Sequence, residues 1–146
     1  MSKVYYTAEA HVTGGRTEGH GRTSDGLLDV QLRIPVDNGG PGGGTNPEQL
    51  FAVGWAACFE GALGVAARRF DTELGDVAID SKIMLVSNPE TRAFNIAARL
   101  DVTLPDVSDP DKAVEIVRAA HAVCPYSNAT RGNIEVELTA NGRAVK

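Results

Sequence analysis

The two cysteines, Cys58 and Cys124, are the side chains of this chain best suited to redox chemistry. Cys58 lies in the apolar segment GWAACFEGAL at residues 54–63, where a cysteine most often packs as a small hydrophobic side chain. Cys124 differs, because it precedes a proline at the expected end of a helix, where a thiol is open to approach. The sequence alone leaves Cys58 either a packing residue or a nucleophile.

A nucleophilic cysteine acts as the thiolate, and burial favours the neutral thiol unless a positive charge lies nearby. Arg16 is the best-presented cation, because it follows Gly14 and Gly15 and a two-glycine hinge permits close backbone approach. The alternative is a solvated loop arginine, and the residues themselves favour that alternative.

Other kinds of site are less well supported by the sequence. His121 and Cys124 have a spacing that allows one shared metal, but zinc needs three or four protein ligands, and His11 and His20 add no standard spacing. The glycine loop at 38–46 lacks the Lys-Ser/Thr ending of a phosphate-binding loop and is either a connector or a point of close approach, and no G-x-S-x-G motif occurs. We therefore expect no metal, nucleotide or serine-hydrolase site.

Composition predicts one globular domain over residues 1–146. The chain is 42% hydrophobic and 23% charged with a formal net charge of −5, and its basic residues form no run that would bind a phosphate backbone. Nucleic acid is therefore not an expected partner. The N-terminal residues lack the pattern of a secretory signal, so we expect a cytoplasmic protein.

The elements that must position these side chains form a mixed α+β pattern in the order ββαββαβ. Asn46 is the predicted N-cap of the first helix, with Pro47 and Glu48 in its first turn and Gln49 completing a capping box. Between Leu50 and Leu63 only Glu60 is charged, so this helix is expected in the centre of the fold rather than in a membrane. Strands are expected at 4–13, 28–36, 77–86, 93–104 and 134–138, with a further short strand near Arg22 as an alternative. A second helix is expected from Asp109 to Cys124. A polar loop at 126–133 follows it, and the chain is expected to end in a frayed tail.

Three segments resemble the organic hydroperoxide resistance (Ohr) branch of the OsmC/Ohr family. They are TGGR at 13–16, GGPGGGTNPEQLFAVGWAACF at 39–59 and AHAVCPYSNATRGNIEVEL at 120–138. The resemblance implies a cofactor-free thiol peroxidase that works as an intertwined homodimer, reduces alkyl and fatty-acid hydroperoxides in oxidative stress defence, and is recycled by lipoyl dithiols carried on proteins.

The resemblance also implies a role for each residue that matches the motifs. Cys58 would be the peroxidatic thiolate, Cys124 the resolving thiol, Arg16 the activating cation and Glu48 the carboxylate that orients it. A slot for the alkyl chain would be lined by Phe51, Trp55, Phe59 and Tyr126. One departure is that Thr17-Glu18-Gly19 follows the arginine, where the family usually has an acidic residue and a glycine at once.

Helix geometry adds a hypothesis about which chain supplies the arginine. Glu48 and Cys58 are ten positions apart, or roughly 15 Å along a helix axis. Since one arginine cannot easily contact both, we predict that Arg16 and Glu48 serve the Cys58 of a partner chain. Two competing readings are an OsmC-like enzyme with a broader peroxide preference and a catalytically silent ligand-binding module in which Cys58 only packs.

Overall fold

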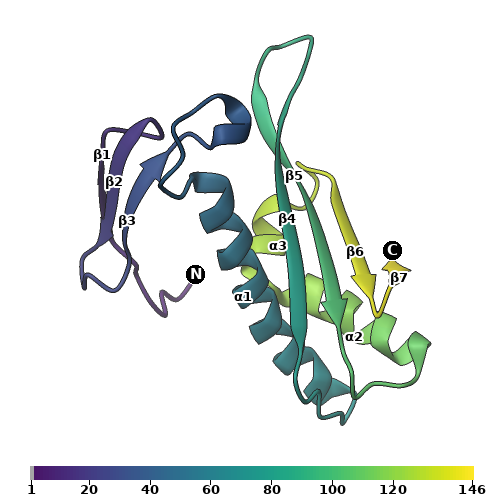
Figure 1. Ribbon diagram of the computed structural model, residues 1–146. Helices are drawn as coiled ribbons and strands as arrows, with labels where there is room; N and C mark the ends of the chain where they lie inside the picture. The colour runs from purple at the N-terminus through teal and green to yellow at the C-terminus, as the bar shows by residue number, and fades with distance from the viewer. Residues whose placement is uncertain (1) are drawn as a thin grey trace. The chain divides into compact units, whose positions relative to one another are not determined.

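The computed structural model describes residues 2–146, which form two compact units that divide after Leu50 (Figure 1). It confirms the α+β class, with more elements than predicted. The strands are β1 (Ala10–Thr13), β2 (Glu18–Thr23), β3 (Asp29–Arg33), β4 (Ala78–Ser87), β5 (Phe94–Thr103), β6 (Val136–Ala140) and β7 (Arg143–Val145). The helices are the 3₁₀ turn η1 (Val36–Asn38), α1 (Pro47–Arg69), α2 (Pro110–Val123) and α3 (Pro125–Thr130).

The first unit contains an antiparallel sheet in the order β1-β2-β3. The alternative strand near Arg22 is confirmed as β2, which carries two glycines and so gives a weak sequence signal. The predicted strand at 4–13 is shorter than expected, because only its last four residues form a ladder with β2. The predicted strand at 28–36 ends at Arg33, ahead of Pro35 and the 3₁₀ turn.

The entry to α1 follows the predicted capping chemistry in part. The side chain of Asn46 accepts a hydrogen bond of 2.9 Å from the backbone N–H of Gln49, as an N-cap residue does. The reciprocal half of the capping box is wrong, because the Gln49 side chain instead accepts a hydrogen bond from the Thr45 hydroxyl. The cap fixes where α1 begins and therefore where Glu48 lies in its first turn.

The second unit contains a four-stranded sheet in the order β4-β5-β6-β7. The strands predicted at 77–86 and 93–104 are confirmed as β4 and β5, which pair antiparallel with Ala78 opposite Thr103 and Ser87 opposite Phe94. β5 and β6 are parallel, so the chain between them must cross over, and α2 and α3 lie in that crossover.

Two predictions about the C-terminal third are wrong. The segment after Cys124 is not all polar loop, because Pro125 begins the short helix α3. The tail after Asn141-Gly142 is not frayed, because these residues have φ values of 49° and 83° and turn the chain back, so that β7 pairs with β6. The Asp109 cap and the end of α2 before Pro125 are as predicted.

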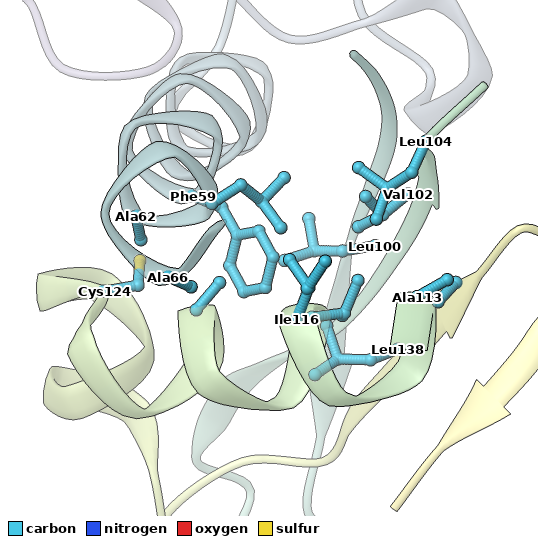
Figure 2. Packing of buried hydrophobic residues seen from close by; sticks show 14 of the residues in the cluster. Phe59, Ala62, Ala66, Leu100, Val102, Leu104, Ala113, Ile116, Cys124 and Leu138 are labelled. Atoms are coloured by element: carbon cyan, nitrogen blue, oxygen red, sulfur yellow. The ribbon is translucent and has the colours of Figure 1, made fainter. Parts of the chain in front are cut away.

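The hydrophobic core of the second unit lies between α1, α2 and the sheet. Figure 2 shows Phe59 from α1, Leu100 from β5 and Ile116 from α2 pointing toward one another, and all three are fully buried. Cys124 belongs to the same buried cluster. The end of α2 that carries this thiol is thus held by core packing.

Only one side of α1 is buried in this core. Val53 and Val65 are 71% and 45% exposed, whereas Trp55, Phe59 and Leu63 have no exposed surface. Of the helices in residues 2–146, α1 alone is long and apolar enough to cross a membrane by length and composition, with a mean hydropathy of 1.6. A core helix passes the same test, and the buried side of α1 fits that reading.

Candidate active site

The two cysteines meet in the second unit. Cys58 lies on α1 and is partly exposed, while Cys124 is the residue between α2 and α3 and is fully buried. The thiols interact directly, because Cys124 forms a side-chain hydrogen bond with Cys58, and neither is in a disulfide. Figure 2 shows the Cys124 sulfur pointing toward α1. The partly exposed thiol and the buried thiol are thus neighbours in the second unit.

The pKa of the Cys58 thiol is raised above its usual value. Burial is the largest cause, followed by the charge of Cys124 and then the hydrogen bond with it. A hydrogen bond from the backbone N–H of Tyr126 acts in the opposite direction and favours the thiolate. The protein groups that surround Cys58 in this chain therefore hold it as the neutral thiol, and a cation would be needed to activate it.

The first unit brings together the other predicted pair, Arg16 and Glu48. Arg16 Nη1 donates to Glu48 Oε2 at 3.1 Å and Nη2 donates to Oε1 at 3.0 Å, a bidentate pair. This contact lowers the pKa of the Glu48 carboxyl and raises that of the guanidinium, through the hydrogen bond in each case. The side chain of Arg16 remains 49% exposed, so its charge is available to another group.

The loop that presents Arg16 depends on glycine. Gly14 and Gly15 both have positive φ, and a Cβ atom on Gly14 would lie 2.2 Å from the carbonyl oxygen of Glu18. Gly19 is equally constrained, since its Cβ would lie 1.8 Å from the carbonyl oxygen of Gly15. The unusual Thr17-Glu18-Gly19 segment thus closes a tight turn into β2, and Arg16 still reaches Glu48.

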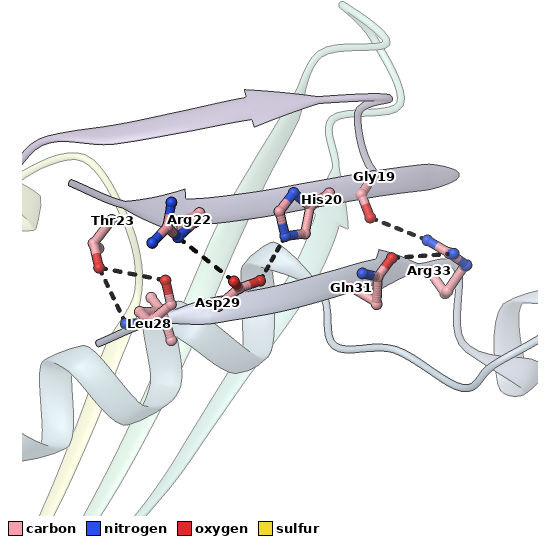
Figure 3. Close-up of polar contacts among 8 residues, drawn as sticks. All are labelled: Gly19, His20, Arg22, Thr23, Leu28, Asp29, Gln31 and Arg33. Carbon is pink, nitrogen blue, oxygen red and sulfur yellow. Dashed lines mark hydrogen bonds and ion pairs between the residues drawn. The ribbon is translucent and has the colours of Figure 1, made fainter. Parts of the chain in front are cut away.

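Further polar contacts of the first unit lie on its sheet (Figure 3). His20 Nε2 is 2.5 Å from Asp29 Oδ1, and Arg22 Nε is 3.6 Å from the other oxygen of the same carboxylate. Within residues 2–146, no three His, Cys, Asp or Glu side chains gather in a group that could hold a metal. These contacts pair strands β2 and β3 through their side chains.

The four residues predicted to line an alkyl slot differ in exposure. Phe51 and Tyr126 are partly buried and meet edge to face, with ring centroids 5.5 Å apart. Trp55 and Phe59 are fully buried, so in this conformation they contribute to the core and offer no surface to a ligand. Phe51 and Tyr126 therefore remain the candidates for substrate contact.

Two contributions to the site were missed by the sequence analysis. The Tyr126 N–H that donates to Cys58 belongs to the first turn of α3, a helix that was not predicted. Ser127 is fully buried and its hydroxyl accepts a hydrogen bond of 3.3 Å from Trp55 Nε1, which ties α3 to α1. Proline directly after Cys124, as a residue typical of a helix start, was the available signal.

The ion pair should make stability depend on pH in a defined direction. Because Glu48 has a lowered pKa in the folded state, its contribution is complete above the ordinary carboxyl pKa of about 4.3 and is lost as the pH falls through the lowered value. We expect Glu48→Gln to lower the free energy of unfolding at neutral pH by about 1 kcal/mol or less, since the pair is partly exposed.

Urea unfolding of the wild type and Glu48→Gln across the acidic range measures this difference. The two curves should converge as Glu48 becomes protonated, and added salt should also narrow the gap. Glu73→Gln, at an exposed glutamate, is the matched control and should track the wild type throughout. A gap between the wild type and Glu48→Gln that persists at the acid end would contradict the assignment to this ion pair.

The fold and the site together define an α+β protein with an arginine–carboxylate pair in its first unit and two neighbouring thiols in its second. Residues 39–139 match the family described as OsmC-like protein. The chain belongs to this family, and the resemblance read from its motifs is confirmed.

The relatives of this chain point to the Ohr branch. It is 50% identical over 139 residues to an organic hydroperoxide resistance protein of Xanthomonas axonopodis pv. citri, a match that covers 94% of this chain and 95% of the other. The crystal structure of the Bacillus subtilis organic hydroperoxide resistance protein OhrB aligns with a TM-score of 0.84 at 43% identity, covering 93% and 98%. A Vibrio cholerae structure with captopril bound in one of the active sites aligns with a TM-score of 0.90 at 38% identity, covering 97% and 96%.

Proposed function

We propose that this protein is a cysteine-based peroxidase that reduces organic hydroperoxides and serves in oxidative stress defence. The observation that carries the proposal is the direct contact between a partly exposed thiol, Cys58, and a buried one, Cys124. Relatives that cover nearly the whole chain and are named for organic hydroperoxide resistance support the substrate class.

The reaction uses each thiol once. The Cys58 thiolate attacks the terminal oxygen of the hydroperoxide; a sulfur–oxygen bond forms as the oxygen–oxygen bond breaks, giving an alcohol and a sulfenic acid. The Cys124 thiol then attacks the Cys58 sulfur, forming the disulfide and releasing water. A lipoyl dithiol is the proposed reductant that returns both cysteines to thiols as it becomes a cyclic disulfide.

The activating cation is proposed to come from a second copy of the chain. The raised pKa of Cys58 requires a positive neighbour, and Arg16, oriented by Glu48, is the proposed one. A homodimer is supported by exposed apolar and aromatic surface on both units, including Tyr5, Tyr6 and Val53. The Vibrio cholerae structure has more than one active site, which fits such an assembly. A cytoplasmic location stays a prediction.

Mass measurement without reductant tests the function. After one equivalent of tert-butyl hydroperoxide, the wild-type chain should lose two hydrogen atoms as the disulfide forms. Cys124→Ser should instead gain oxygen on Cys58 and stop, because no other thiol remains. An unchanged wild-type mass would favour the silent ligand-binding module. Equal rates with hydrogen peroxide and alkyl hydroperoxides would favour the broader OsmC-like preference.

A further inference from the structure

Gly54, on α1, leaves room for the hydroxyl group of Tyr126, on α3. A Cβ atom on Gly54 would lie 2.8 Å from the Tyr126 hydroxyl oxygen and 3.4 Å from the ring carbon that bears it. Glycine inside a helix costs about 1 kcal/mol relative to alanine, so its presence here calls for a reason. The close approach of the tyrosine is that reason.

This position is one helical turn before Cys58. Residues four apart on a helix lie on the same face, with Cβ atoms about 5–6 Å apart, and side chains lean toward the helix N-terminus. The Cys58 thiol therefore leans toward Gly54 and the hydroxyl that lies over it. The backbone N–H of Tyr126 meanwhile donates to the Cys58 sulfur. Tyr126 thus contacts the nucleophile at its backbone and places its hydroxyl beside the preceding turn.

The ring of Tyr126 is held in place while its hydroxyl is left available. Phe51 packs against it edge to face at 5.5 Å, and Trp55 lies 6.5 Å away. Trp55 satisfies its own N–H by donating to Ser127, but among the side-chain hydrogen bonds of residues 2–146 none uses the Tyr126 hydroxyl. A fixed phenol with a free O–H, next to a nucleophile, is arranged to donate to a bound ligand.

We infer that the Tyr126 hydroxyl is the acid that protonates the leaving oxygen of the hydroperoxide. The inference rests on the proposed peroxidase function. The Cys58 thiolate attacks the terminal oxygen, which keeps its hydrogen, and a sulfur–oxygen bond forms. The oxygen–oxygen bond breaks at the same time, and the electron pair of that bond goes to the alkyl-bearing oxygen. That oxygen takes the Tyr126 proton and leaves as the alcohol, and the tyrosinate regains a proton from water. A phenol is a much stronger acid than an aliphatic alcohol.

Tyr126→Phe tests this role, because it removes the hydroxyl and keeps the ring. With tert-butyl hydroperoxide, the single-turnover rate constant for Cys58 oxidation, followed by rapid quench and mass measurement, should fall about 100-fold. With peracetic acid the rate should change less than about twofold, because acetate leaves without a proton from an acid. Ser108→Ala, which removes an exposed hydroxyl from the loop before α2, is the control and should leave both rates unchanged.

Alkylation of Cys58 by iodoacetamide measures the nucleophile independently of any leaving oxygen. Its rate should be the same in the wild type and in Tyr126→Phe. An equal fall with both oxidants and with iodoacetamide would overturn the acid role, since Tyr126 would then only position the thiol. Unchanged oxidation by tert-butyl hydroperoxide would also overturn it while leaving the peroxidase intact. A wild type that does not react with tert-butyl hydroperoxide would contradict the proposed function itself.

Discussion

Cys58→Ser and Arg16→Ala chains should each lose hydroperoxide reduction by on the order of 10³-fold or more, and a mixture of the two should recover part of the wild-type activity. Serine has no thiolate to attack the peroxide. Without Arg16 no cation lowers the raised pKa of Cys58, so the neutral thiol persists. If Arg16 serves the partner's thiol, a mixed dimer contains one complete site. Random pairing of equal amounts should then give about a quarter of the wild-type activity. Steady-state reduction of tert-butyl hydroperoxide with dihydrolipoamide, after joint refolding, measures the recovery.

The reason to expect recovery is the length of helix between the two functional positions. Glu48 holds both guanidinium nitrogens of Arg16 in the first turn of α1, and Cys58 follows ten residues later in the same helix. At about 1.5 Å per residue, roughly 15 Å of helix axis lies between them. From this helix geometry we expect an arginine held at the first position to serve the thiol of a partner chain.

A reversed mixture provides the control. Chains that carry both Cys58→Ser and Arg16→Ala are mixed with wild-type chains. Under the partner arrangement the mixed dimer has no complete site, so activity should fall below the share of wild-type chains present. Activity in proportion to the fraction of wild-type chains, together with no recovery in the first mixture, would place each site within one chain and contradict the partner hypothesis.

The sequence predicted the elements whose signals are local. Asn46 and Asp109 begin their helices as N-caps, because each side chain accepts a hydrogen bond from a backbone N–H two or three residues on. Strands, by contrast, depend on distant partners. β7 is three residues long and exists through pairing with β6, and most of the segment at 4–13 has the residue types of a strand without a ladder to join.

The site was predictable in residue type but not in arrangement. The segment around Cys58 is consistent with a core cysteine, and only the resemblance to a family assigned it a partner in Cys124. Their contact is made by the crossover that brings the end of α2 to α1, which no local pattern encodes. Likewise, the raised pKa of Cys58 comes first from burial, which is a property of the packed fold.

Replacing Phe59 with alanine should lower the free energy of unfolding by about 3–5 kcal/mol. Phe59 is fully buried beside the catalytic candidate Cys58, and its ring faces Leu100 and Ile116 in the core (Figure 2). The cost combines the lost apolar burial with the cavity left in a close-packed interior.

Phe94→Ala is the matched control: Phe94 is 73% exposed, so its loss should cost about 0.5 kcal/mol or less. Urea unfolding at one fixed protein concentration compares the two, since an oligomer's stability depends on concentration. Equal costs would contradict the placement of Phe59 at the centre of the core and favour the exposed slot-lining role predicted from sequence.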